Sequence, residues 1–116
     1  MKKTKMLKKN YEFKKVLTKG KYYSGRQIEA FVKENNLKNQ NLLGIAISVK
    51  IAKAVKRNKI KRLIRENYKV FENRIKPSNS IIFLWKKKVT IEQATYENIY
   101  TDMEKILKKA NLFIEE

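Results

Sequence analysis

The stretch Lys53-Ala-Val-Lys-Arg-Asn-Lys-Ile-Lys-Arg-Leu-Ile-Arg-Glu66 combines an apolar stripe at helical spacing with a dense basic face. Ile60, Leu63 and Ile64 form the stripe. At 100° per residue, a polar group falls about 100–200° away from Ile60. That group consists of Asn58, Lys61, Arg62, Arg65 and Lys69. The spacing therefore predicts a long helix over residues 54–72 that packs one face on a core and presents a basic face outward.

The charge of this segment is one-sided. Positions 50–69 hold nine Lys or Arg residues and one acid, Glu66. A solvated surface helix, which is the ordinary alternative, mixes both signs of charge. Several of these cations also lie in the first turn, where the helix dipole already presents positive partial charge. A sequence that opposes local stability in this way indicates an anionic partner, and clustered Lys and Arg on one face are typical of nucleic-acid binding.

The composition of the whole chain supports the same interpretation. The 116 residues carry a formal charge of +18, with 42% hydrophobic residues. That length predicts a single domain spanning residues 1–116, with enough apolar content for a core. Cysteine is absent, so the chain has no thiolate nucleophile and no cysteine metal ligand. Histidine is also absent, which removes the commonest general base and the commonest metal ligand. With no apolar run of signal or membrane-spanning length, we expect a cytoplasmic protein.

Periodicity on either side of the basic segment predicts the remaining elements. We expect helices over residues 7–19 and 95–110, and strands over residues 27–33, 42–49 and 81–85. Residues 1–6 are expected to be mobile. The strand over 81–85 is apolar on both faces, so both should be covered. This order predicts an α+β fold in which helices pack on one sheet.

A second candidate binding feature lies on the strand over residues 27–33. Alternation places Phe31 on its polar face, where it is either an isolated exposed aromatic or a platform for an unpaired base. The small residues Gly44, Ala46 and Ser48 on one face of the next strand would leave room for a groove beside it. Phe13 either completes that wall or simply packs in the core.

The acidic residues do not resemble an active site. No carboxylate pair accompanies a histidine, and no glycine-rich phosphate loop is present. Asp102 and Glu104 lie on an amphipathic helix, where solvated surface is the better interpretation. An independent active site on the polypeptide is therefore not expected.

The basic segment closely resembles a motif of the bacterial ribonuclease P protein family. That motif is an Arg-Asn-Arg core followed by Ile-Lys-Arg-Leu-Ile-Arg, and here the core reads Arg57-Asn58-Lys59. The resemblance extends upstream through Gly44-Ile-Ala-Ile-Ser48 and Leu7-Lys-Lys-Asn-Tyr-Glu-Phe13-Lys-Lys-Val16. It covers nearly the whole chain and is most specific at the basic segment.

The resemblance implies an α-β-β-β-α-β-α sandwich, an extra short strand near Tyr22–Ser24 and a left-handed β-α-β crossover around the basic helix. It also implies a subunit of ribonuclease P, an endoribonuclease in which a catalytic RNA with RNA-bound magnesium removes the 5′ leader of precursor tRNA. The partners would be that RNA and precursor tRNA, with no membrane and no required protein partner. The implied RNA-binding residues are Arg57, Asn58, Lys59, Lys61, Arg62 and Arg65. The implied 5′-leader cleft consists of Phe13, Leu17, Arg26, Phe31 and Ser48.

Five positions depart from the family pattern. Lys59 keeps the charge of the usual Arg but loses its planar fork. Leu17 replaces a frequent aromatic, so stacking there becomes apolar contact. Val49 replaces a usual Lys and removes one charge from the cleft, Ala52 replaces a usual Gly, and Trp85 replaces a common Arg.

Composition alone leaves two other classes open. A ribosomal or rRNA-packing protein needs the same kind of basic α/β domain. A DNA regulator could insert the basic helix into a major groove, but no partner helix or half-site geometry accompanies it.

Overall fold

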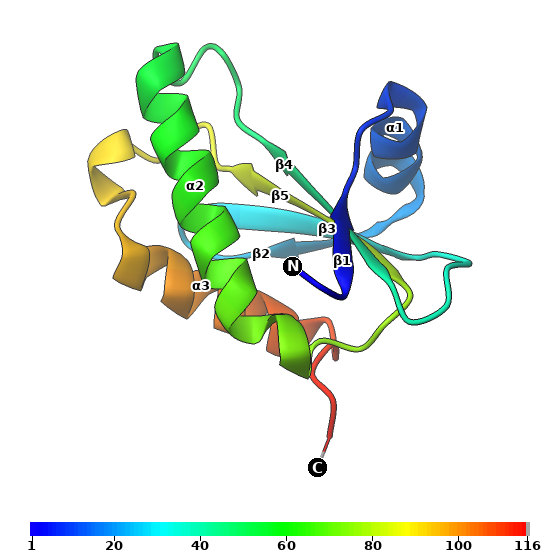
Figure 1. The fold of residues 1–116 in the computed structure, drawn as a ribbon. Coiled ribbons are helices and arrows are strands. Elements are labelled where there is room, and N and C mark those ends of the chain that lie inside the picture. The colour runs from blue at the N-terminus through cyan, green and yellow to red at the C-terminus, as the bar shows by residue number, and fades with distance from the viewer. Residues whose placement is uncertain (116) are drawn as a thin grey trace.

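The computed structural model describes residues 1–115 as a five-stranded mixed sheet with three helices packed on it (Figure 1). The strands are β1 (Thr4–Met6), β2 (Lys21–Ser24), β3 (Ile28–Glu34), β4 (Asn41–Ala46) and β5 (Asn79–Trp85). The helices are α1 (Asn10–Lys19), α2 (Ala54–Phe71) and α3 (Tyr96–Lys109), with short 3-10 turns at Glu72–Arg74 and Ile91–Gln93. The strand order β1-β4-β5-β3-β2 places β5 at the centre. The α+β architecture predicted from the sequence is confirmed.

The central strand β5 is covered on both faces, as its apolar sequence predicts. Ile81 and Phe83 belong to the main core, which α2 and α3 close on one side of the sheet. Ile82, between them, faces the other side and packs with Leu7 and Val16 beneath α1. Residues at alternate positions of β5 therefore join two separate apolar layers.

The connection from β4 through α2 to β5 joins two neighbouring parallel strands. In Figure 1, α2 crosses one face of the sheet between them, and the crossover is left-handed as the resemblance implies. Nearly all such connections in proteins are right-handed. The same topology brings the first turn of α2 close to the end at which β4 and β5 terminate.

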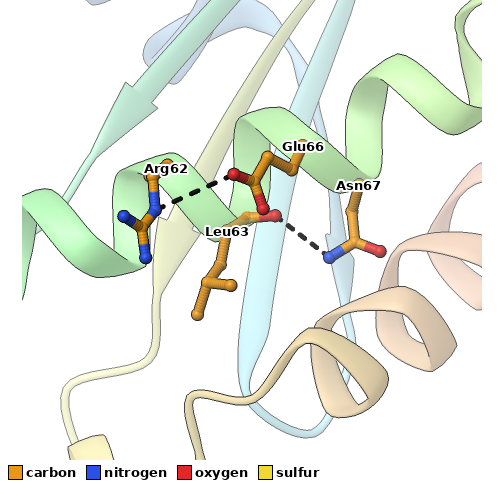
Figure 2. A network of polar contacts seen from close by, with 4 residues as sticks. All are labelled: Arg62, Leu63, Glu66 and Asn67. Carbon is orange, nitrogen blue, oxygen red and sulfur yellow. Dashed lines mark hydrogen bonds and ion pairs between the residues drawn. The ribbon is translucent and has the colours of Figure 1, made fainter.

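The apolar stripe of α2 is buried as the helical spacing predicts. Ile60, Ile64 and Phe71 are at most 1% exposed, and Leu63 is also buried. Asn67 lies on the same face, and its side-chain amide donates to the backbone oxygen of Leu63 at 3.0 Å (Figure 2). The same amide donates to the backbone oxygen of Tyr96 at 3.3 Å. The bond to Tyr96 ties α2 to the start of α3 and fixes which face of α2 points outward.

The expectation of a mobile N-terminus is wrong for residues 4–6. They form β1, which pairs in parallel with β4, and the amide of Leu7 donates to the Leu43 oxygen at 2.8 Å. The hydroxyl groups of Thr4 and Tyr68 are hydrogen-bonded at 2.8 Å, and burial raises the pKa of Tyr68 to about 12. Because residues 4–7 pair with the sheet, α1 begins at Asn10 and not at residue 7.

The end of one strand also differs from the sequence prediction, whereas the end of α1 agrees with it. The strand predicted over residues 42–49 ends at Ala46, because the chain turns there and the Ile51 amide donates to the Ser48 oxygen at 3.1 Å. Gly20 does end α1, although its φ of −76° is ordinary. A Cβ at this position would lie 2.5 Å from the Val16 oxygen, so close backbone approach is what requires glycine.

The assignment of Asp102 to solvated surface is also wrong. Its side chain is 2% exposed, and its carboxylate accepts the backbone N–H groups of Arg26, Gln27 and Ile28 at 3.0, 2.6 and 3.0 Å. The acid thus holds the turn between β2 and β3 against α3. Helical periodicity could not reveal this role, because the donors are more than 70 positions away in the sequence.

We expect Asp102→Ala to lower the free energy of unfolding by about 3 kcal/mol, since it leaves buried N–H donors without an acceptor. The neighbouring substitution Glu104→Ala, on the half-buried side of the same helix, should change it by less than about 0.5 kcal/mol. Urea denaturation of the two variants measures the difference. Equal stabilities would show that water or another group replaces the carboxylate.

Candidate nucleic-acid interface

The outward face of α2 is available for binding. None of the five residues assigned to this face is buried: Asn58, Arg62 and Lys69 are exposed, and Lys61 and Arg65 are half-buried. Arg62 approaches Glu66 at 3.8 Å in an exposed pair, which contributes little to stability (Figure 2). This is the only ion pair within residues 1–115, so nearly all the cations described there lack a direct carboxylate partner.

The first turn of α2 lacks the groups that usually stabilise a helix N-terminus. It contains no acid, and Lys53 at the cap position makes no side-chain capping bond. By contrast, α3 is capped by Thr95 and carries Glu97 in its first turn. Free backbone N–H groups surrounded by cations provide a strong attraction for an anion.

Arg57 takes part in the local structure of this turn as well. It is half-buried, and its Nη1 donates to the Ala52 oxygen at 2.7 Å. That bond closes the junction between the preceding loop and α2. Asn58 and Lys59, the other members of the core motif, are exposed, and their side chains make no hydrogen bond within residues 1–115.

The structure brings three of the predicted cleft residues together on the opposite face of the sheet. Phe13 and Leu17 from α1 and Phe31 from β3 are partly buried members of one apolar cluster. The cluster also contains Ile82 and Leu84 of β5. Since α1 contacts β3 and β5 but leaves Phe31 and Leu84 half-exposed, this side of the sheet keeps an accessible apolar surface.

The predicted groove over the small residues of β4 is only partly present. A Cβ on Gly44 would lie 2.7 Å from a ring carbon of Phe13, so Phe13 already occupies that space. Ala46 and Ser48 further along remain half-exposed. The small residue at position 44 therefore makes room for α1, and the open part of the surface begins beyond it.

Tyr22 is a member of this surface that the sequence reasoning missed. It lies opposite Phe31 in the β2–β3 pair, with ring centroids 5.2 Å apart and planes tilted by 53°. Its hydroxyl donates to Oε2 of Glu29 at 2.6 Å, and this bond raises the pKa of Tyr22 above its ordinary value. The short strand implied near Tyr22–Ser24 could have predicted this position. If that strand forms a hairpin with the strand that carries Phe31, Tyr22 lies opposite Phe31.

Arg26 and Ser48 lie at one end of the sheet and outside the aromatic cluster. β4 and β5 both end there and β3 begins there, with the Lys86 amide donating to the Gln27 oxygen at 2.9 Å. Arg26 is exposed in the β2–β3 turn. Ser48 lines a cavity of about 370 Å³ together with Lys50, Lys87 and Lys88. Cations from the β4–α2 connection and from the segment after β5 thus line one cavity, and Arg26 lies at the same end of the sheet.

Two of the departures from the family pattern have structural consequences. The Trp85 side chain is 2% exposed, and its Nε1 donates to the Val89 oxygen at 2.9 Å. The ring therefore belongs to the core and offers no face for stacking. Val49 is 72% exposed, so an apolar side chain projects into water where the family usually has a cation.

Comparison with known proteins agrees with this geometry. The family model for ribonuclease P matches residues 1–111. The chain is 35% identical over 107 residues to the ribonuclease P protein component of Thermoanaerobacter sp. (strain X514), covering 92% of this chain and 90% of that protein. It is 34% identical over 114 residues to that of Clostridium novyi (strain NT), covering 97% and 99%.

Solved structures show the same architecture. The Staphylococcus aureus RNase P protein superposes with a TM-score of 0.82 at 35% identity, over 94% of this chain and 97% of that one. The Thermotoga maritima protein shares the fold at 23% identity, with a TM-score of 0.79 over 97% and 99%. An uncapped basic helix on a five-stranded mixed sheet defines a small RNA-binding α+β protein. This chain belongs to the ribonuclease P protein family and is a component of the ribonuclease P holoenzyme.

We expect Lys59→Ala to weaken binding to ribonuclease P RNA and to reduce the slope of log K against log salt by about one. Lys109→Ala removes an equally exposed lysine from the last turn of α3 and serves as the control. Filter binding over a salt series measures both slopes. Equal loss in the two variants would mean that net charge, and not the α2 face, governs affinity.

Proposed function

We propose that this protein is the non-catalytic subunit that holds two RNA elements for ribonuclease P. The outer face of α2 binds the catalytic RNA, and the aromatic surface between α1 and the first turn of α2 binds the 5′ leader of precursor tRNA. The observation that carries this proposal is the first turn of α2, which has free N–H donors, several cations and no acid. In this proposal the catalytic RNA, and not the protein, removes the leader.

The outer face of α2 suits a folded RNA backbone. Arg62 and Arg65 offer planar donors that bind phosphate oxygens in pairs, whereas Lys61 supplies a mobile charge. The exposed Lys59 adds another mobile charge beside this face. Asn58 adds a donor and an acceptor, which fits 2′-hydroxyl groups. Because most of these cations lack a direct carboxylate partner, phosphates would also relieve their mutual repulsion.

The opposite face of the sheet suits a single strand. Phe31 and Tyr22 present partly exposed rings, on which unpaired bases stack with little dependence on sequence. Arg26, Lys50, Lys87 and Lys88 lie at the end of the sheet where phosphates of the same strand would pass. Leu17 contributes apolar contact in place of a stacking ring.

The chemistry of the cleavage is assigned to the RNA. Within residues 1–115, no group of three or more His, Cys, Asp or Glu side chains is placed to hold a metal ion. The described residues thus offer no cluster of carboxylates for magnesium, and in this proposal the ions bind RNA phosphates. Asp102, the most buried acid among the described residues, accepts three backbone N–H groups of the β2–β3 turn.

We expect precursor tRNA to be cleaved when the catalytic RNA is present, with a gain on adding the protein, and to remain intact with the purified protein alone. Gel analysis of end-labelled precursor measures both. Cleavage at the mature 5′ end by the protein without RNA would refute the assignment.

We expect Phe31→Ala to weaken binding of precursor tRNA to the holoenzyme about tenfold, within the range for loss of one stacked base. Mature tRNA should bind as before, because it carries no leader. Phe31→Leu keeps apolar contact with the cluster and controls for folding. Shortening the leader should reproduce the effect of Phe31→Ala, and an equal loss for mature tRNA would show that Phe31 does not contact the leader.

A further inference from the structure

Glu29 is an acid within a surface whose other charged residues are mainly cations. It lies on β3, opposite Ser24 of β2 and Leu84 of β5, and two residues before Phe31. Side chains two positions apart on a strand share a face and lie about 7 Å apart. Glu29 is therefore beside the ring of Phe31 and half-exposed on the same side of the sheet.

The Glu29 carboxylate is held in place by a hydrogen bond, but only part of its acceptor capacity is occupied. The Tyr22 hydroxyl donates to Oε2 at 2.6 Å, and Tyr22 itself packs against Phe31. Within the described residues, no lysine or arginine pairs with Glu29. A carboxylate has about four acceptor positions, so Oε1 and a second position on Oε2 remain free.

Those free positions are unsuited to an RNA backbone, since phosphate and carboxylate repel each other. They match the N–H groups at the edge of a base. Guanine presents adjacent N1–H and N2–H donors that meet both carboxylate oxygens, and cytosine and adenine each present one amino group. Uracil offers a single N–H flanked by two carbonyl oxygens, and these oxygens would repel the carboxylate.

We propose that Glu29 determines base preference in the leader site, by accepting N–H groups from the Watson–Crick edge of the base stacked at Phe31 and Tyr22. The preferred base is guanine and the least favoured is uracil. The inference rests on the proposed function, because it requires the leader to occupy this face. It adds base recognition to stacking, which by itself is tolerant of sequence.

The test uses holoenzyme reconstituted with wild-type protein and precursor tRNAs in which each leader position carries each of the four bases in turn. We expect one position at which guanine binds about tenfold more tightly than uracil, as for a hydrogen bond to a charged group. Glu29→Gln should reduce that ratio to less than about threefold, because an amide offers both a donor and an acceptor. Tyr22→Phe keeps the ring but frees the carboxylate, and should reduce the ratio partly.

Glu34→Gln is the matched control, because it makes the same charge change at the exposed end of the same strand, away from Phe31. It should leave the base ratio unchanged. The inference is overturned if no leader position discriminates guanine from uracil, or if Glu29→Gln and Glu34→Gln raise affinity equally for all four bases. In either case a retained preference for precursor over mature tRNA leaves the proposed function intact. Loss of that preference in the wild-type holoenzyme would instead contradict the proposed function itself.

Discussion

Burial of β5 between two apolar layers is the constraint on which the rest of the structure depends. Ile81 and Phe83 pack beneath α2 and α3, while Ile82 packs beneath α1. Full burial of each such side chain contributes roughly 1.5–3 kcal/mol. Because β5 pairs with β4 on one side and β3 on the other, it also aligns the strand ends. The loops that carry Arg26, Ser48 and Lys87 are thereby brought to one end of the sheet.

This arrangement separates two surfaces of different chemistry. The outer face of α2 is basic and faces away from the sheet, since Ile60, Ile64 and Asn67 hold the helix by its other side. The surface beneath α1 is aromatic, with Phe31 and Tyr22 as its accessible rings. The first turn of α2 adds a third feature, since it has no acid and no side-chain cap. The proposed function assigns a structured RNA to the first of these surfaces and a single strand to the second.

The N-terminus of α2 lacks stabilising groups that other parts of the protein have. The first turn of α2 has no acid and no capping side chain, whereas α3 has both. Asp102 provides a contrasting case, in which a buried charge is satisfied by three backbone N–H groups and stabilises the hairpin that carries Arg26. The lysine and arginine side chains of α2 thus lie outside the core, where an anionic partner can reach them.

The sequence by itself determined the apolar stripe and basic face of α2, the doubly buried β5, the alternation that exposes Phe31, and the family motif at Arg57-Asn58-Lys59. These features are periodic or contiguous, so they can be recognised within a few neighbouring residues. Only the tertiary structure decided that residues 4–6 pair with β4, that Asp102 is an anchor, that Trp85 is core, and that Tyr22 holds Glu29 beside Phe31. Each of these depends on contacts between separate elements, and the identity of a residue does not specify which distant backbone or side chain will face it.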